Sequence, residues 1–359
     1  MNELPMPSDV KSASGESAPQ TPAIEPPSVK LIVRLFVIPA IIVALAVGIM
    51  LLIGRMAGGE PSLEEALARL KSPGGERTTA WMVGPASKQR YMDAKVLTDK
   101  MKEPGGMSPA ERIELSNKLV ELLRGGYVHP EEGEVQHFVL LAIGRVWQID
   151  PAQGKLETPE AKQARADAMK LLTEYASAKD VSTRKAAVFA PVFWKGYEEV
   201  QQALPGIVSK LNDPSEDLDV RMAAATVLGV IGKPDDAQVV QGLKQALRDD
   251  RPEDVELVWD SALSLAELGL PDGQDTVLKL LDRKELAGLK FFDRESDPKN
   301  PTFRQLSEEE QQRILINAME GVKHLKTPAV SAKLQELADK DPSQRVRWEG
   351  KEALREMGK

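Results

Sequence analysis

Apolar residues recur at helical spacing along most of the chain, between short polar turns. Val220, Ala224 and Leu228, for example, fall four positions apart, which places them on one face of a helix. Gly232 is expected to take the left-handed conformation that ends such a helix, and Pro234 prevents its continuation. No run of alternating apolar residues is long enough to predict a sheet. The pattern therefore predicts an all-α body.

Polar residues mark where the helices begin. Ser62, Ser108 and Ser307 each stand three positions before a glutamate, which is the signature of a capping box. Thr158 and Thr327 each precede a proline, which is favoured at the first helical position. These five residues predict five helix starts.

The helical pattern repeats. Gly-Lys-Pro-Asp at 232–235 returns as Gly-Leu-Pro-Asp at 269–272, and the same shift of 37 residues carries Leu228 onto Leu265. Asp-Pro-Ser followed by Val-Arg occurs at 213–221 and again at 341–347. Self-similarity of this kind marks an array of stacked helical hairpins.

These segments resemble HEAT repeats of the short bacterial type, with Asp-Pro, Val-Arg, an Ala-rich turn, Leu-Gly and Gly-x-Pro-Asp in that order. The resemblance covers 204–283 best, and extends over 307–358 and 86–203. It implies a right-handed α-solenoid of about six helical hairpins with a final capping helix. The order of one apolar segment before the repeats is similar to bacterial single-pass membrane proteins with a HEAT-repeat domain.

The apolar segment at 31–54 carries no charge from residue 35 to residue 53. As a helix it is long enough to cross a hydrocarbon core of about 30 Å. A cleaved signal peptide would be shorter and would follow a short basic start. We therefore predict a disordered tail over 1–30, a transmembrane helix that spans the lipid bilayer, a stalk helix and linker over 55–85, and the solenoid over 86–359.

Charges beside the apolar segment bear on its orientation. Lys30 and Arg34 precede it, whereas Arg55 alone follows closely. Basic residues concentrate on the cytoplasmic side of membrane proteins. We therefore expect the solenoid on the periplasmic-type side rather than in the cytoplasm.

Composition excludes several kinds of chemistry. The net charge of -8 argues against a nucleic-acid-binding surface. The chain has no Cys and three His, so most nucleophilic and metal-dependent reactions lack the residues they need. Gly-x2-Gly-Lys-Pro at 229–234 differs from a phosphate-binding loop, which has four residues between its glycines and follows a strand. We expect no enzymatic activity, no cofactor and no metal.

One cluster allows a second interpretation. His129 and His137 lie in a short segment with Glu131, Glu132 and Glu134, and imidazole with carboxylate is a plausible ligand set for zinc. The favoured interpretation is an acidic first turn of a helix, with His137 packed beside the next residue.

Other charged and aromatic residues have structural explanations. Arg184, Arg221 and Arg347 follow aspartates at equivalent repeat positions, where they could bind an anionic partner or cross-link adjacent repeats. The cross-linking role, typical of HEAT-like arrays, is favoured. Trp259 and Trp348 fall at repeat-core positions, so we expect them to be packed rather than to stack on a ligand.

We predict a scaffold that binds another protein at the membrane, because solenoids present extended concave surfaces. The second helices of the hairpins are expected to line this surface. Their outward residues are Gln241, Lys244, Gln245, Arg248, Lys279, Arg283, Lys333 and Glu336. The alternatives are a HEAT-like enzyme of the lyase type and a nucleic-acid-binding solenoid.

An insertion at 284–306 interrupts the repeats and contains Phe291, Phe292 and Phe303. Insertions in repeat proteins commonly emerge as loops on the binding face. The insertion is therefore either a partner-binding loop or a structural lid that packs on its own solenoid.

Overall fold

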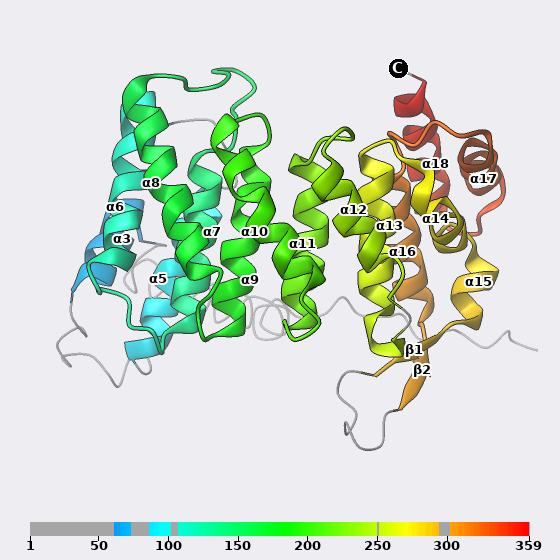
Figure 1. The fold of residues 1–359 in the computed structure, drawn as a ribbon, viewed down its shortest axis with the longest axis horizontal. Coiled ribbons are helices and arrows are strands. Elements are labelled where there is room, and N and C mark those ends of the chain that lie inside the picture. Colours follow the sequence, from blue (N-terminus) through cyan, green and yellow to red (C-terminus); the bar gives the residue numbers. More distant parts are fainter. Residues whose placement is uncertain (1–60, 73–85, 102–106, 250, 294–301, 359) are drawn as a thin grey trace, which may run out of the picture. The chain divides into compact units, whose positions relative to one another are not determined.

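The computed structural model describes residues 61–72, 86–101, 107–249, 251–293 and 302–358 (Figure 1). Most of these residues are helical. The helices are α3 (Leu63–Lys71), α5 (Ala86–Lys100), α6 (Pro109–Arg124), α7 (Gly133–Val146), α8 (Pro159–Tyr175), α9 (Val181–Phe189), α10 (Leu204–Asn212), α11 (Leu218–Ile231), α12 (Ala237–Ala246), α13 (Val255–Glu267), α14 (Gln274–Leu280), α15 (Arg283–Gly288), α16 (Glu308–Gly321), α17 (Pro328–Lys340) and α18 (Gln344–Met357). Short 3-10 turns are η2 (Ala190–Trp194), η3 (Glu198–Gln202), η4 (Pro252–Asp254) and η5 (Pro271–Gly273).

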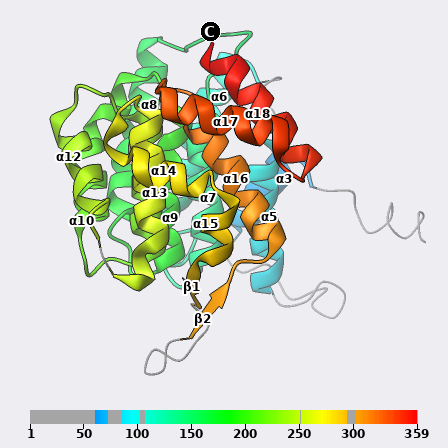
Figure 2. The ribbon, with the colours of Figure 1, turned by 90° about the vertical axis from the view of Figure 1, so that its right-hand side faces the viewer.

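The helices stack in two layers (Figures 1 and 2). The first layer consists of α5, α7, α9, α11, α13, α16 and α18, each in contact with the next. The second layer consists of α6, α8, α10, α12, α14 and α17, and each of these contacts a helix of the first layer. Stacked hairpins of this kind form a HEAT-like helical fold, as the repeats predicted.

The predicted helix starts are confirmed. Capping boxes open α3, α6 and α16 at Ser62, Ser108 and Ser307. Thr158 and Thr327 cap α8 and α17, each with proline in the first turn. In each case a side-chain oxygen satisfies a backbone N–H that the helix leaves unpaired.

The predicted repeat register is also confirmed. Helices α13 and α14 begin at Val255 and Gln274, each 37 residues after the start of its counterpart, α11 or α12. Leu228 and Leu265 are both fully buried. Equivalent positions of the two repeats therefore fill equivalent places in the core.

The expectation for Gly232 is wrong. Its φ of -67° and ψ of 170° are extended rather than left-handed, whereas Gly269 has a φ of 74°. A Cβ at Gly232 would lie 2.3 Å from the carbonyl oxygen of Leu228 and 2.8 Å from Val239. Glycine is needed here because a Cβ would clash with the last turn of α11 and with Val239 of α12, not because the backbone is left-handed.

Arg221 joins adjacent repeats, as predicted. Its guanidinium donates to Asp249 at 3.1 Å and to Asp254 at 2.6 Å, and its Nε donates to the carbonyl of Leu211. Arg251 also contacts both aspartates. Burial raises the pKa of Asp254, whereas the hydrogen bond from Arg251 holds the pKa of Asp249 below its usual range.

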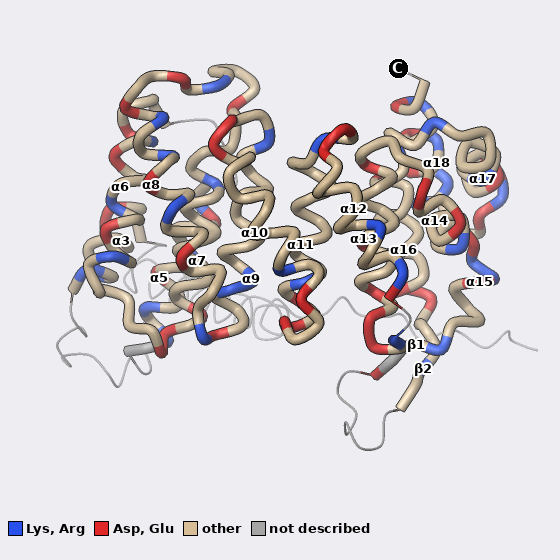
Figure 3. Tube along the Cα trace, in the orientation of Figure 1, with Lys and Arg blue, Asp and Glu red and all other residues tan. Residues whose placement is uncertain are grey.

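Of the other two arginines of this set, Arg184 also cross-links repeats, whereas the prediction is wrong for Arg347. Arg184 donates to Glu216 at 2.8 Å and 2.9 Å. Arg347 donates to the carbonyls of Asp341 and Pro342 and so closes its own loop. Asp341 in turn accepts from Arg283 of the preceding repeat. Basic and acidic residues are interspersed over the described helices, in keeping with such cross-links (Figure 3).

Two features differ from the sequence-based prediction. Helix α3, expected to be a stalk, packs into the array: Ala66, Leu67 and Leu70 are buried in the core, and Arg90 donates to the carbonyl of Leu70. The insertion contains two short strands, β1 (Lys290–Phe292) and β2 (Phe303–Gln305), so the body is not wholly helical. Three-residue strands are too short to show the alternation that predicts a sheet.

The prediction of a membrane anchor concerns residues outside those that the structure describes. The predicted tail at 1–30 and transmembrane helix at 31–54 both belong to this part of the chain. Among the described helices, none has the length and apolar character needed to span a bilayer.

Candidate interaction surface

The predicted outward residues lie mostly in the second layer, on α12, α14 and α17, or immediately after them. Gln241, Gln245, Arg248, Lys279 and Glu336 are exposed. The remaining three, Lys244, Arg283 and Lys333, form ion pairs with neighbouring repeats.

These ion pairs occupy charges that were expected to be available to a partner. Lys244 lies 2.7 Å from Asp272, and Lys333 lies 2.7 Å from Asp282. The hydrogen bond from Lys333 holds the pKa of Asp282 below its usual range. The second-layer lysines thus contribute to the contacts between repeats.

The insertion forms an antiparallel hairpin that projects beyond the ends of α13 and α16 (Figures 1 and 2). Its register pairs Phe291 with Arg304 and Phe292 with Phe303. The Phe291 ring packs on Trp259 of α13, with 5.7 Å between ring centroids. Phe291 thus behaves as part of a lid, whereas Phe303 is 48% exposed.

An ion pair fixes the same hairpin to α16. Arg304 lies over the Phe291 ring at 5.6 Å, and its guanidinium donates two hydrogen bonds to Glu310 at 2.7 Å and 2.8 Å. These bonds, with those from Ser307, lower the pKa of Glu310 to about 2. The base of the hairpin is therefore held by an aromatic contact on one helix and by a bidentate ion pair on another.

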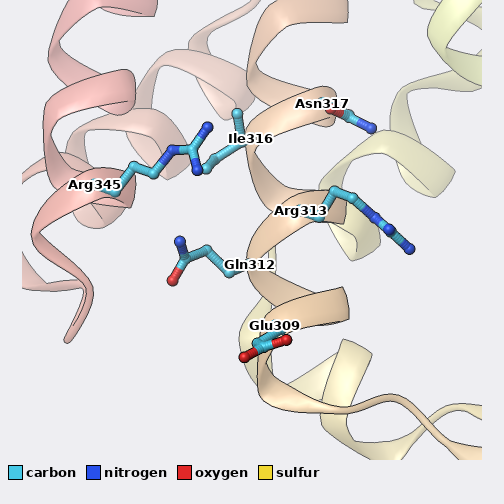
Figure 4. A pocket seen from close by; sticks show the side chains of 6 residues that line it. All are labelled: Glu309, Gln312, Arg313, Ile316, Asn317 and Arg345. Atoms are coloured by element: carbon cyan, nitrogen blue, oxygen red, sulfur yellow. The ribbon is translucent and has the colours of Figure 1, made fainter. Parts of the chain in front are cut away.

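A pocket of about 340 Å³ lies along α16, next to the start of α18 (Figure 4). Its lining side chains come from three turns of α16 and the first turn of α18. They are Glu309, Gln312, Arg313, Ile316, Asn317 and Arg345. The capping box at Ser307 sets the register of α16, which brings positions three and four apart to the same side.

The two arginines of the pocket differ from those between the repeats. Within the described residues, Arg313 and Arg345 make no hydrogen bond and no ion pair, and both are exposed. By contrast, Arg221, Arg283 and Arg304 each bind a carboxylate. Two guanidinium groups beside a polar pocket are therefore available to a ligand.

Trp348 extends the exposed surface on α18. The prediction that it packs in the core is wrong, because the side chain is 58% exposed. Helix α18 buries Val346 and Gly350 instead, and Trp348 lies on the opposite side. Trp259 is half-buried as expected, against Phe291.

The histidine-containing segment is organised around an ion pair. Glu132 accepts from Arg90 at 2.6 Å and from the backbone N–H of His129. The His137 ring packs edge-on against Phe138, with 5.2 Å between centroids, as the favoured interpretation predicted. Over the described residues, no group of three potential ligands is placed to hold a metal ion.

Comparison with known proteins gives a likeness of fold only. No family model and no curated protein sequence matches the chain. The chain is similar to a solved structure of human deoxyhypusine hydroxylase in complex with glycerol, at 16% sequence identity and a TM-score of 0.30. The match covers 85% of this chain and 99% of that chain.

This match corrects the expectation that the chain is not an enzyme. The matched protein is an enzyme by its name. At that identity and TM-score the likeness assigns no reaction and no catalytic residue to this chain.

Proposed function

We propose that this chain is a helical-repeat scaffold that binds a protein partner through the surface of α16, α18 and the hairpin. The observation that carries the proposal is the pocket whose two guanidinium groups, on Arg313 and Arg345, have no partner among the described residues. By contrast, Arg184, Arg221 and Arg283 are each paired with a carboxylate. A bound partner would supply the missing acceptors.

The composition of this surface supports a protein as the partner. Arginine and aromatic residues are enriched at protein interfaces and often dominate their binding energy. Here Arg345 and exposed Trp348 lie on α18, Arg313 lies on α16, and exposed Phe303 lies on the hairpin. The surface thus spans three elements.

Site-specific photo-crosslinking tests the proposal. A photoreactive amino acid replaces Gln312 in the pocket or, as a matched control, exposed Gln241 of the second layer in full-length protein. We expect a protein adduct of defined mass from position 312 and none from position 241. An adduct from position 241 alone would place the partner on the second layer, as the sequence predicted. No adduct from either position would contradict a protein-binding role for these surfaces.

Membrane attachment is part of the proposal. The uncharged segment within 31–54 would anchor the scaffold, and the basic residues before it favour the periplasmic-type side. Full-length protein should then stay with membranes in alkaline carbonate, and a C-terminal alkaline phosphatase fusion should be active. Release of the protein by carbonate would contradict the predicted transmembrane helix. An inactive fusion would place the C-terminal part in the cytoplasm instead.

The alternative is a HEAT-like enzyme; the matched hydroxylase is an enzyme by its name. Enzymes bind substrates in concave sites where a few polar groups converge, and the same pocket is the place to look for one. This alternative would be favoured if the photoreactive residue at position 312 captured a small molecule and no protein.

A further inference from the structure

We infer that the pocket along α16 and the start of α18 binds an extended acidic segment of the partner that crosses α16, with one carboxylate at Arg345 and another at Arg313. This inference rests on the proposed function and adds the chemistry of the occupant. Carboxylates are the natural acceptors for guanidinium groups, with which they form two parallel hydrogen bonds.

The arrangement of the pocket favours a chain over a small anion. In Figure 4 Arg345 extends from α18 toward Ile316, whereas Arg313 and Asn317 extend from the other side of α16. The two guanidinium groups therefore face different parts of a ligand that crosses α16. A segment with two separated acids can pair with both.

Glu309 gives the bound segment a direction. It lies seven residues before Ile316, which corresponds to about 10 Å along a helix. An acidic ligand group is repelled at the Glu309 end and attracted at the Arg345 end. We therefore expect the acidic residues of the segment to lie near the C-terminal half of α16, with an uncharged or basic residue beside Glu309.

An apolar residue of the segment has a place beside these charges. Trp348 is three positions after Arg345, so both lie on the same side of α18. Its exposed indole and the side chain of Ile316 offer apolar contact next to the guanidinium of Arg345. The segment is thus acidic with at least one large apolar side chain.

An anionic membrane is a different class of partner, and the acidic residues at the start of α16 argue against it. Glu309 lines the pocket, and Glu308 precedes it in the first turn of α16; both side chains are exposed. A flat anionic surface would bring its charge against both. A peptide can avoid them by its sequence.

Fluorescence anisotropy with full-length protein in detergent tests the inference. The probe is a dye-labelled peptide of Glu, Leu and Ser, and its comparison has Lys in place of Glu. We expect the acidic probe to bind, with affinity falling as salt rises, and the lysine probe not to bind. Arg313→Glu with Arg345→Glu should weaken binding about tenfold or more. Arg248→Glu, which reverses an exposed arginine on the second layer, should leave binding unchanged.

The remaining outcomes separate this inference from the proposed function. Binding of the acidic probe that survives the double charge reversal, or equal binding of the lysine probe, would overturn the acidic occupant. If crosslinking at Gln312 still captured a protein, the scaffold would stand and only the chemistry of its partner would change. Retention on phosphatidylglycerol vesicles that is lost in the double variant, without peptide binding, would assign the surface to lipid and overturn the inference.

Trp348→Ala gives a second test that does not depend on charge. Because the side chain is exposed, its removal should leave the unfolding midpoint unchanged. The Trp348→Ala variant should bind the acidic probe several-fold more weakly than the natural chain does. An acidic probe with Ser in place of Leu lacks the apolar contact, so the variant and the natural chain should bind it equally. If Trp348→Ala weakened the binding of both probes equally, Trp348 would not contact the apolar residue of the segment.

Discussion

The ring of Phe291 lies on that of Trp259, with 5.7 Å between centroids and 41° between planes. This contact joins an inserted hairpin to the first layer of the array. It gives the hairpin a structural role close to the exposed surface proposed to bind a partner.

Replacement of Phe291 should therefore affect folding. Phe291→Ala should lower the free energy of unfolding by about 1–3 kcal/mol, because a half-buried aromatic contact is lost. Phe303→Ser, at an exposed position of the paired strand, should change it by less than about 0.5 kcal/mol. Urea unfolding of both variants decides between lid and loop. Equal, small effects would show that the hairpin does not depend on Trp259.

The ion pair between Arg304 and Glu310 should make the hairpin sensitive to acid. The pKa of Glu310 is about 2 in the folded chain, below its usual value of 4.5. A carboxyl with a lowered pKa contributes stability above its unfolded pKa, and this contribution is lost as pH falls from 4.5 toward 2. Arg304→Gln should therefore lower the urea midpoint at pH 6 more than at pH 2.5. Because the ion pair is partly exposed to solvent, the effect on the midpoint should be small. If the difference in midpoint between the variant and the natural chain were the same at both pH values, the proposed role of the pair would be contradicted.

Replacement of Arg221 should lower the stability of the fold far more than replacement of an exposed arginine. Arg221→Ala removes the buried guanidinium that Asp249 and Asp254 share across the repeats and leaves them only Arg251, so it should cost about 1–3 kcal/mol. Arg248→Ala, at an exposed position of the second layer, should change stability by less than about 0.5 kcal/mol. Similar midpoints for the two variants would mean that Arg221 does not hold the repeats together.

The repeat register predicts matched effects in the core. Leu228→Ala and Leu265→Ala remove fully buried side chains from equivalent positions, and each should cost about 2–5 kcal/mol. Leu→Ala at either site is measured by chemical unfolding of full-length protein. A small loss at one site and a large loss at the other would show that the two repeats are not packed alike.

Local sequence signals predicted much of the fold because they act over a few residues. Capping at Ser62, Ser108 and Ser307 depends on contacts three positions apart, and the structure has all three boxes. The shift of 37 residues between repeats depends only on the order of apolar residues and turns. It correctly aligned α11 with α13.

Features set by neighbouring elements could not be predicted in the same way. A Cβ at Gly232 would clash with the carbonyl of Leu228 and also with Val239 on the next helix. Trp348 is exposed because no element covers that side of α18 within the described residues. The hairpin strands are held by contacts to Trp259 and Glu310, which lie on other helices.

The pocket was missed for the same reason. The register of α16 places Arg313 on a polar stripe, a signal that the sequence does contain. Only the packing of α18 beside α16 brings Arg345 to the same site. The residues predicted to bind a partner do lie together on the second layer. Three of them, however, form ion pairs with neighbouring repeats.

Hydrogen exchange with and without the captured partner distinguishes binding at α16 and α18 from binding at the second layer. Bound partner is expected to slow exchange in α16 and α18, over 308–321 and 344–357, and to leave α12, over 237–246, unchanged. Slower exchange on α12, α14 and α17 with none on α16 and α18 would contradict this expectation and move the binding surface to the second layer.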